Sequence, residues 1–173
     1  MTKPQHSPTR IRPLTEADLD AVEQIEAMSG LVPWGREYYL RDLALPPVIL
    51  LACVTTAGDV AGFIHAWVIA DEFQLNNMAV HPDWRRQGTG RALLTAALDI
   101  ARAQGATSGA LEVRAANTAA QALYARFGFT CATIRREYYR NPPDDAWLMT
   151  SGLNAECGMR NGANGEGGRR NGE

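Results

Sequence analysis

The stretch MAVHPDWRRQGTGRALLTAAL, from Met78 to Leu98, decides the fold that we expect for this chain. It runs from an apolar, strand-like segment through a basic turn with two glycines into a segment with helical periodicity. The apolar residues of that last segment are Leu93, Leu94, Ala97, Leu98 and Ala101, and they recur on one helical face. Gly105 ends the pattern. The stretch therefore predicts a strand, a tight turn and a helix over 90–104.

Strand and helix patterns alternate around this stretch. The sequence predicts strands over 10–14, 48–56, 60–70, 73–80, 108–114, 129–139 and 146–152, and helices over 15–28, 36–45 and 117–128. Thr15 and Asp18 are spaced as a capping box for the first helix, and the strands over 48–56 and 60–70 are close enough to form a hairpin. Parallel strands need helical crossovers, which the second half supplies. The expected fold class is α/β (α+β), a mixed sheet with helices packed on it.

Length and composition indicate one globular domain. The chain has 173 residues, of which 46% are hydrophobic and 21% charged. We expect a flexible N-terminus at 1–9, one domain at 10–153 and a disordered tail at 154–173, because the tail is rich in Gly, Asn and Arg and poor in large apolar side chains. We also expect a monomer.

Charge and hydropathy exclude several classes of partner. The formal net charge of −2 disfavours nucleic-acid binding. No apolar run approaches the ~20 residues that span a bilayer, and the first ten residues lack the apolar stretch of a secretion signal. We therefore expect a cytoplasmic protein that does not act at a membrane.

The cysteines and histidines do not form a metal pattern. Cys53, Cys131 and Cys157 have neither disulfide nor zinc spacing, so we expect reduced thiols, with Cys53 and Cys131 in the core. His65 and His81 have no second ligand at metal spacing, and we expect structural or solvent-facing roles for both. No metal is expected.

The turn RRQGTG at 85–90 has the properties of an anion site. Its glycines let the backbone approach a bound group closely. The amides of 86–91 would be unpaired donors at a helix start, where the dipole favours negative charge, and a pyrophosphate suits them. Leu93 lies three residues after Gly90, which excludes GxGxxG, and no Lys followed by Ser or Thr completes a Walker pattern. An ordinary solvated loop is the alternative.

The segment NMAVHPDWRRQGTGRALL, residues 77–94, resembles the acyl-CoA signature of the GNAT N-acetyltransferases. LEVRAANTAAQALYARFGF and ATIRREYY are similar to regions of the RimI type, the ribosomal-protein-alanine N-acetyltransferases, and LVPWG at 31–35 resembles their Pro-Trp loop. The resemblance covers 71–149 most closely. It implies a GNAT-like, mixed but mostly antiparallel sheet of about seven strands with helices on both faces.

The resemblance also implies where acetyl-CoA would bind. It assigns a strand end to the thioester carbonyl and the pantetheine arm, the turn to the pyrophosphate, and a helix-capping asparagine to the cofactor. These positions are Met78, Ala79, Val80, Arg86, Gln87, Gly88, Thr89, Gly90, Arg91 and Asn117. A core role for the strand residues and a capping role for the asparagine are compatible with it.

Two side chains are implied in the proton transfers. Glu112 lies in an otherwise apolar strand end, where burial would raise its pKa, and the resemblance makes it the proton acceptor, directly or through a water. A surface position or a structural ion pair with an arginine is the alternative. Tyr124 lies on a helix whose apolar face would make it a core residue, and the resemblance makes it the proton donor to the departing sulfur. We expect direct transfer without an acyl-enzyme.

The acceptor that the resemblance implies is a protein N-terminus, specifically the N-terminal alanine of a small-subunit ribosomal protein. Trp34, Tyr138 and Tyr139 could line a peptide groove, and Glu72 could pair with the positive N-terminus. Each could also have an ordinary packing or ion-pair role. Acetylation of a lysine or of a small amine remains open, as does a module that binds acyl-CoA without turnover.

Overall fold

The computed structural model describes residues 8–31 and 33–153, and the predicted tail at 154–173 and most of the predicted N-terminal segment lie outside them. The strands are β1 (Thr9–Pro13), β2 (Val48–Thr55), β3 (Val60–Ile69), β4 (Glu72–Val80), β5 (Ser108–Arg114), β6 (Thr130–Arg140) and β7 (Pro143–Gly152). The helices are α1 (Leu19–Met28), α2 (Arg36–Leu43), α3 (Thr89–Ala103) and α4 (Thr118–Ala125), with short 3-10 turns at Glu16–Asp18 and Pro82–Trp84.

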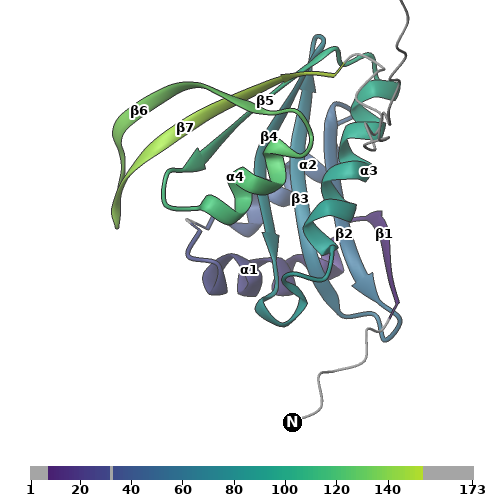
Figure 1. Ribbon diagram of the computed structural model, residues 1–173. Helices are drawn as coiled ribbons and strands as arrows, with labels where there is room; N and C mark the ends of the chain where they lie inside the picture. Colours follow the sequence, from purple (N-terminus) through teal and green to yellow (C-terminus); the bar gives the residue numbers. More distant parts are fainter. Residues whose placement is uncertain (1–7, 32, 154–173) are drawn as a thin grey trace, which may run out of the picture.

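The strands form one sheet in the order β1-β2-β3-β4-β5-β7-β6. Only β4 and β5 are parallel among the described pairs. Figure 1 shows α1 and α2 on one face of the sheet and α3 and α4 on the other, with the β6–β7 hairpin curving away from the body. The prediction of a mostly antiparallel, seven-stranded sheet with helices on both faces is confirmed.

The predicted capping box is present, but it opens a 3-10 turn at Glu16–Asp18, and α1 itself begins at Leu19. The Asp18 carboxylate accepts hydrogen bonds from the Thr15 amide and hydroxyl, both at 2.8 Å, which closes the predicted capping box. Arg12 on β1 binds the same carboxylate through two hydrogen bonds of 2.7 Å. These bonds, the arginine's above all, lower the pKa of Asp18 to about 2. The start of α1 is thus anchored to the first strand by a bidentate ion pair.

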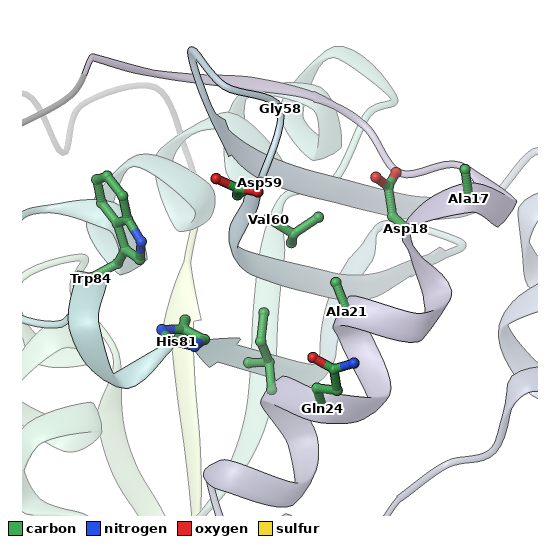
Figure 2. A pocket seen from close by; sticks show the side chains of 10 residues that line it. Ala17, Asp18, Ala21, Gln24, Gly58, Asp59, Val60, His81 and Trp84 are labelled. Carbon is green, nitrogen blue, oxygen red and sulfur yellow. The ribbon is translucent and has the colours of Figure 1, made fainter.

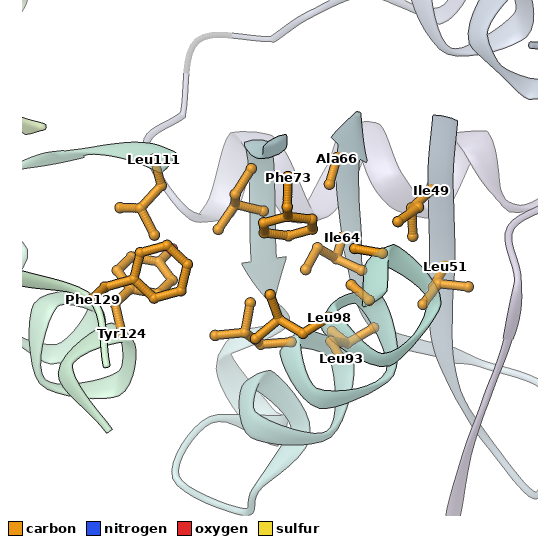
Figure 3. Close-up of a cluster of buried hydrophobic side chains, with 14 of the residues drawn as sticks. Ile49, Leu51, Ile64, Ala66, Phe73, Leu93, Leu98, Leu111, Tyr124 and Phe129 are labelled. Carbon is orange, nitrogen blue, oxygen red and sulfur yellow. The ribbon is translucent and has the colours of Figure 1, made fainter. Parts of the chain in front are cut away.

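Each face of the sheet has its own apolar core. Under α3 and α4, Leu93 and Leu98 pack with Ile64 and Phe73, and Tyr124 packs with Phe129 (Figure 3). Under α1 and α2 a second cluster forms, whose buried members are Leu14, Leu19, Val22, Ile25, Tyr39, Leu50, Ala52, Val54, Phe63 and Ala79. Burial of both faces explains the continuous apolar run of β2.

A bulge in β4 opens the sheet. His65 pairs with Asn77 but Ala66 pairs with Leu75, so Asn76 is an extra residue on β4. The pairing of β4 with β5 ends at the same place, at Leu75. Beyond it, β4 pairs only with β3, and β5 only with β7. The two parallel strands therefore separate, and the backbone of residues 76–80 is left without a partner on the β5 side.

On the edge strand β6, the predicted burial of Cys131 is wrong. Cys131 was expected in the core, but its side chain is exposed, whereas Cys53 is buried as expected. The reason is that β6 is the outermost strand and extends beyond the helices, so most of its residues face solvent. β7 also begins three residues earlier than predicted, at Pro143, because its polar start pairs with the end of β6.

Candidate active site

The glycine turn places a row of backbone amides at the start of α3. Gly88 caps the helix in the left-handed conformation, with φ 89°, and Arg86 also has a positive φ of 62°. The first helical hydrogen bond runs from the Ala92 amide to the Gly88 carbonyl at 2.9 Å. The amides of Thr89, Gly90 and Arg91 precede this bond and have no helical acceptor. This geometry fits the predicted anion site.

The two glycines of the turn differ in their surroundings. A Cβ on Gly88 would meet nothing within 4 Å, so the space beside it is open to a ligand. A Cβ on Gly90 would lie 3.4 Å from Leu123 of α4 and 3.6 Å from Val80 of β4. Both are ordinary van der Waals distances, so position 90 is packed between α4 and the end of β4, whereas the space beside Gly88 is open.

Side chains of the turn hold its shape. Gln87 donates a hydrogen bond of 2.6 Å to the Asp83 carbonyl, and Thr89 donates one of 3.2 Å to the Trp84 carbonyl. Both residues were predicted to bind the cofactor, and their side chains support the turn while its amides face outward. Sequence reasoning gave no such role to Arg85, which donates to the Val80 carbonyl at 3.0 Å and to the Ser29 hydroxyl at 3.1 Å.

The opening exposes alternate backbone groups of β4. The His81 amide donates to the Ala61 carbonyl of β3 at 2.9 Å. Because backbone polar groups alternate in direction along a strand, those of Ala79 also face β3, and those of Met78 and Val80 face the opening. The 3.0 Å bond from Arg85 to the Val80 carbonyl agrees with this assignment. Among the three predicted strand positions, Met78 and Val80 can therefore offer amides to a ligand.

Glu112 lies on β5, just past the point where β4 and β5 separate. Leu111 and Val113 belong to the core under α3 and α4, so Glu112 faces the opposite side of the sheet. The expected burial of Glu112 is wrong, because that side is uncovered here and its carboxylate is solvent-exposed. It forms an ion pair with Arg135 of β6. The ion pair with an arginine, which was the alternative to a catalytic role for Glu112, is therefore present.

Tyr124 lies on the face of the sheet opposite to that of Glu112. It lies on α4, is 6% exposed and meets the ring of Phe129 edge-on at 6.3 Å. Burial, with a smaller contribution from Tyr139, raises its pKa, so the phenol keeps its proton at neutral pH. Tyr139 also interacts electrostatically with Glu112, and burial chiefly raises the pKa of Tyr139. Tyr139 therefore interacts electrostatically with both the predicted acid and the predicted base.

The β6–β7 hairpin brings both predicted tyrosines to this region. The Arg114 guanidinium lies 4.0 Å above the Tyr139 ring and donates to the carbonyls of Asn141 and Pro142. Tyr138 meets Tyr139 edge-on at 5.2 Å and is 48% exposed. The hairpin loop is thus held against β5, with Tyr138 open to solvent.

The remaining predicted positions are Asn117, Trp34 and Glu72. Asn117 accepts a hydrogen bond of 3.1 Å from the Ala120 amide, so it caps α4 directly after β5. Trp34 lies before α2, on the face with Glu112, and its ring is 5.1 Å from that of His65. Glu72 is not brought to the opening: it begins β4, pairs with Ser108 in the closed part of the sheet, and accepts a hydrogen bond from Gln74.

A separate hollow of about 490 Å³ lies between α1 and the β2–β3 turn (Figure 2). It is lined by Ala17, Asp18, Ala21, Gln24, Ile25, Gly58, Asp59, Val60, His81 and Trp84. None of the residues predicted for cofactor or acceptor binding lines it, and its Asp18 is already bound by Arg12. Within 8–31 and 33–153, no cluster of three His, Cys, Asp or Glu side chains could hold a metal, and no helix has the length and hydropathy to cross a bilayer.

The sequence that forms this fold matches a known class of acyl-transfer proteins. Residues 19–129 match the model of the acetyltransferase (GNAT) family. Because that match spans more than half of the chain, the chain belongs to the GNAT acetyltransferase family.

More specific relatives share most of their length with this chain. It is 41% identical over 129 residues to the [ribosomal protein bS18]-alanine N-acetyltransferase of Escherichia coli (strain K12), covering 75% of this chain and 86% of that protein. It is 32% identical over 144 residues to a putative [ribosomal protein bS18]-alanine N-acetyltransferase of Bacillus subtilis (strain 168), covering 83% and 95%. The crystal structure of the Escherichia coli ribosomal-protein-S18-alanine N-acetyltransferase superposes with a TM-score of 0.76 at 36% identity, covering 84% of this chain and 94% of that chain.

Proposed function

We propose that this protein transfers an acetyl group directly from acetyl-CoA to the α-amine of a protein N-terminus, specifically an N-terminal alanine of a small-subunit ribosomal protein. The observation that carries the proposal is the separation of β4 from β5 beside the amides of α3. Glu112 and Tyr124 approach that opening from opposite faces of the sheet. The names of the relatives support the substrate class.

The donor side would be bound by the backbone. The amides of Gly88, Thr89, Gly90 and Arg91 face a diphosphate at the positive end of the α3 dipole. Met78 and Val80 present their backbone groups to the opening, where a pantetheine arm can pair as an added strand. An amide at the same edge can donate a hydrogen bond to the thioester carbonyl and stabilise the negative charge that develops on it.

The transfer needs two proton movements. The neutral amine forms a C–N bond to the thioester carbonyl carbon, Glu112 takes a proton from the nitrogen directly or through a water, and the C–S bond breaks. Tyr124 gives its proton to the departing sulfur, so the products are an acetylated amine and the free thiol. Glu112 must leave its ion pair with Arg135 to serve as base, and an acceptor arriving on that face can displace the arginine.

An α-amine is the easier acceptor for one exposed carboxylate. Its reference pKa is ~7.7–8.0 compared with ~10.4 for lysine, so a far larger fraction is neutral at pH 7. The tyrosines of the β6–β7 hairpin and Trp34 lie on the side from which Glu112 is reached, and they offer flat surface to an extended peptide.

A peptide panel tests this function. Purified protein and acetyl-CoA are incubated with peptides that differ only in their first residue, with a lysine-containing, N-terminally blocked peptide as control, and with small-subunit ribosomal proteins. Mass spectrometry should find one acetyl group on the α-amine of the alanine peptide and of one ribosomal protein. Acetylation of the blocked peptide's lysine, or of small amines alone, would support the alternative acceptors. Coenzyme A binding without any transfer would indicate a binding module.

A further inference from the structure

A buried hydrogen-bonded pair, Asp42 and His65, joins α2 to β3. Asp42 is 1% exposed and His65 is fully buried. The Nε2 of His65 lies 2.8 Å from Oδ2 of Asp42. Trp67 donates to the same oxygen at 3.1 Å, and Arg41 donates to Oδ1 at 3.1 Å. The carboxylate is thus bound from β3 and from its own helix.

The protonation of this pair follows from its surroundings. Burial lowers the pKa of His65, although Asp42 opposes the shift. Burial alone would raise the pKa of Asp42, but hydrogen bonds from His65, Trp67 and Arg41 together lower it. The pair therefore consists of a carboxylate and a neutral imidazole that donates from Nε2.

The arrangement leaves one buried atom unsatisfied. Nδ1 of His65 is then an acceptor, and it has no hydrogen-bond partner within the described part of the chain. A buried acceptor without a donor lowers stability, and apolar residues of similar volume often serve stability as well as a buried polar pair that contains a charge, or better. Stability alone therefore gives a poor account of why this pair is here.

The imidazole is in contact with Trp34. The ring centroids of His65 and Trp34 lie 5.1 Å apart at 66°, and those of Trp34 and Tyr38 lie 5.0 Å apart at 85°. His65 also pairs across the strands with Asn77, the first residue of β4 after the bulge. The indole is thus held edge-on beside the part of β4 that lines the opening, on the face that Glu112 shares.

We propose that Asp42 and His65 are a positioning pair that fixes the Trp34 indole on the acceptor side and thereby sets the affinity for the acceptor peptide. Asp42 holds the orientation of the imidazole, and the imidazole holds the indole. The inference rests on the proposed function, because it takes the acceptor to bind on this face. It assigns no chemical step to either residue.

The test uses the apolar double variant Asp42→Leu/His65→Leu. Its KM for the alanine peptide should rise at least about tenfold, which is the loss expected for one misplaced aromatic contact, with little change in kcat or in the KM for acetyl-CoA. His65→Gln, which can still donate to Asp42 but has no ring beside the indole, should keep the fold and still raise the peptide KM. If the double variant does not fold, Asp42→Asn carries the same prediction at about threefold, because a neutral amide accepts a weaker hydrogen bond.

A double-mutant cycle separates positioning from general damage. Trp34→Ala should raise the peptide KM by itself, and adding the Leu pair to it should raise KM no further. Additive effects, an equal rise in the acetyl-CoA KM, or a folded Leu variant with normal peptide KM would overturn the proposal.

A measurement without acceptor keeps the inference distinct from the proposed function. With 5-fluorotryptophan incorporated, the Trp34 resonance is identified by its loss in Trp34→Phe. It should be narrow in the parent protein and move toward the position of solvent-exposed fluorotryptophan in the Leu pair. An unmoved resonance contradicts the inference even if acetylation is normal. A moved resonance in a protein that acetylates no peptide supports the positioning and rejects the function.

Discussion

The face of the sheet under α3 and α4 and the face under α1 and α2 meet the same opening with different chemistry. On the first, backbone amides at the start of α3 and along Met78 and Val80 are available to a ligand. On the second, side chains dominate: Glu112 with Arg135, the tyrosines of the hairpin, and Trp34. A donor that is always coenzyme A can be bound by the invariant main chain, whereas acceptor choice depends on side chains.

The largest effect is expected when the proposed proton donor to the departing sulfur is removed, and it should fall on the chemical step rather than on acetyl-CoA binding. Tyr124→Phe removes the phenolic proton but keeps the ring against Phe129, so kcat should fall about 10³-fold, within the usual range for loss of a general acid. The KM for acetyl-CoA should change little in steady-state assays. Normal turnover would show that the thiolate leaves without this proton.

A smaller effect is expected from the acceptor face. Glu112→Gln should lower kcat/KM for the peptide about 100-fold at pH 7. The defect should shrink by no more than about tenfold toward pH 9, because an α-amine with a pKa of ~8 is already about one-tenth neutral at pH 7 and the nitrogen still has to lose a proton as the C–N bond forms. Arg135→Ala is the matched control, since it frees the carboxylate and should keep or raise the activity. A Glu112→Gln variant as active as the parent at pH 7 would argue that the carboxylate serves only in a structural ion pair.

Substitution of one glycine on each face by alanine compares the two faces. Gly88 before α3 and Gly35 before α2 both have positive φ, 89° and 84°, and an added Cβ would meet nothing within 4 Å at either. Alanine should therefore lower stability at both, by about 1 kcal/mol at Gly88, which is in the left-handed helical region, and by more at Gly35, whose ψ is 143°. Gly88→Ala should also raise the KM for acetyl-CoA about tenfold, since the Cβ enters the diphosphate space. Gly35→Ala should leave that KM unchanged, and equal changes in both variants would refute the separation of roles.

The last effect is on stability rather than activity and concerns the anchoring of α1 on the acceptor face. The pKa of Asp18 is about 2 in the folded protein and 3.8 without its partners. The resulting stabilisation, about 2 kcal/mol, is fully present above pH 3.8 and is lost as the pH falls toward 2. Arg12→Ala should remove most of it at pH 7 and flatten the decline of Tm with acid. A parallel acid decline in both proteins would contradict the ion pair's role.

The donor face could be predicted because its signals are local. The glycines, the strand before them and the helical periodicity after them lie within 78–98, and the capping box spans four residues. Sequence spacing fixes such features before any tertiary contact forms. The resemblance supplied the roles of Glu112 and Tyr124, which stay predictions.

The acceptor face could not be predicted in the same way, because it depends on contacts between residues that lie far apart in the sequence. Asp42 meets His65 23 residues away, and Arg85 reaches Ser29 56 residues away, so no local pattern reveals either contact. Glu112 and Cys131 were placed in the core because their strands look apolar, but alternation turns Glu112 to the uncovered face and strand order leaves Cys131 at the edge. Glu72 is acidic and close to β4 in sequence, yet the bulge that opens the sheet lies at its far end.

Amide NMR during titration with coenzyme A tests the central claim most directly. The account predicts large shifts for the amides of Gly88, Thr89, Gly90 and Arg91 and for Met78 and Val80, with Ala79 almost unmoved because its amide is bonded to β3. Shifts at Ala79 as large as those of its neighbours, or none at the start of α3, would contradict it.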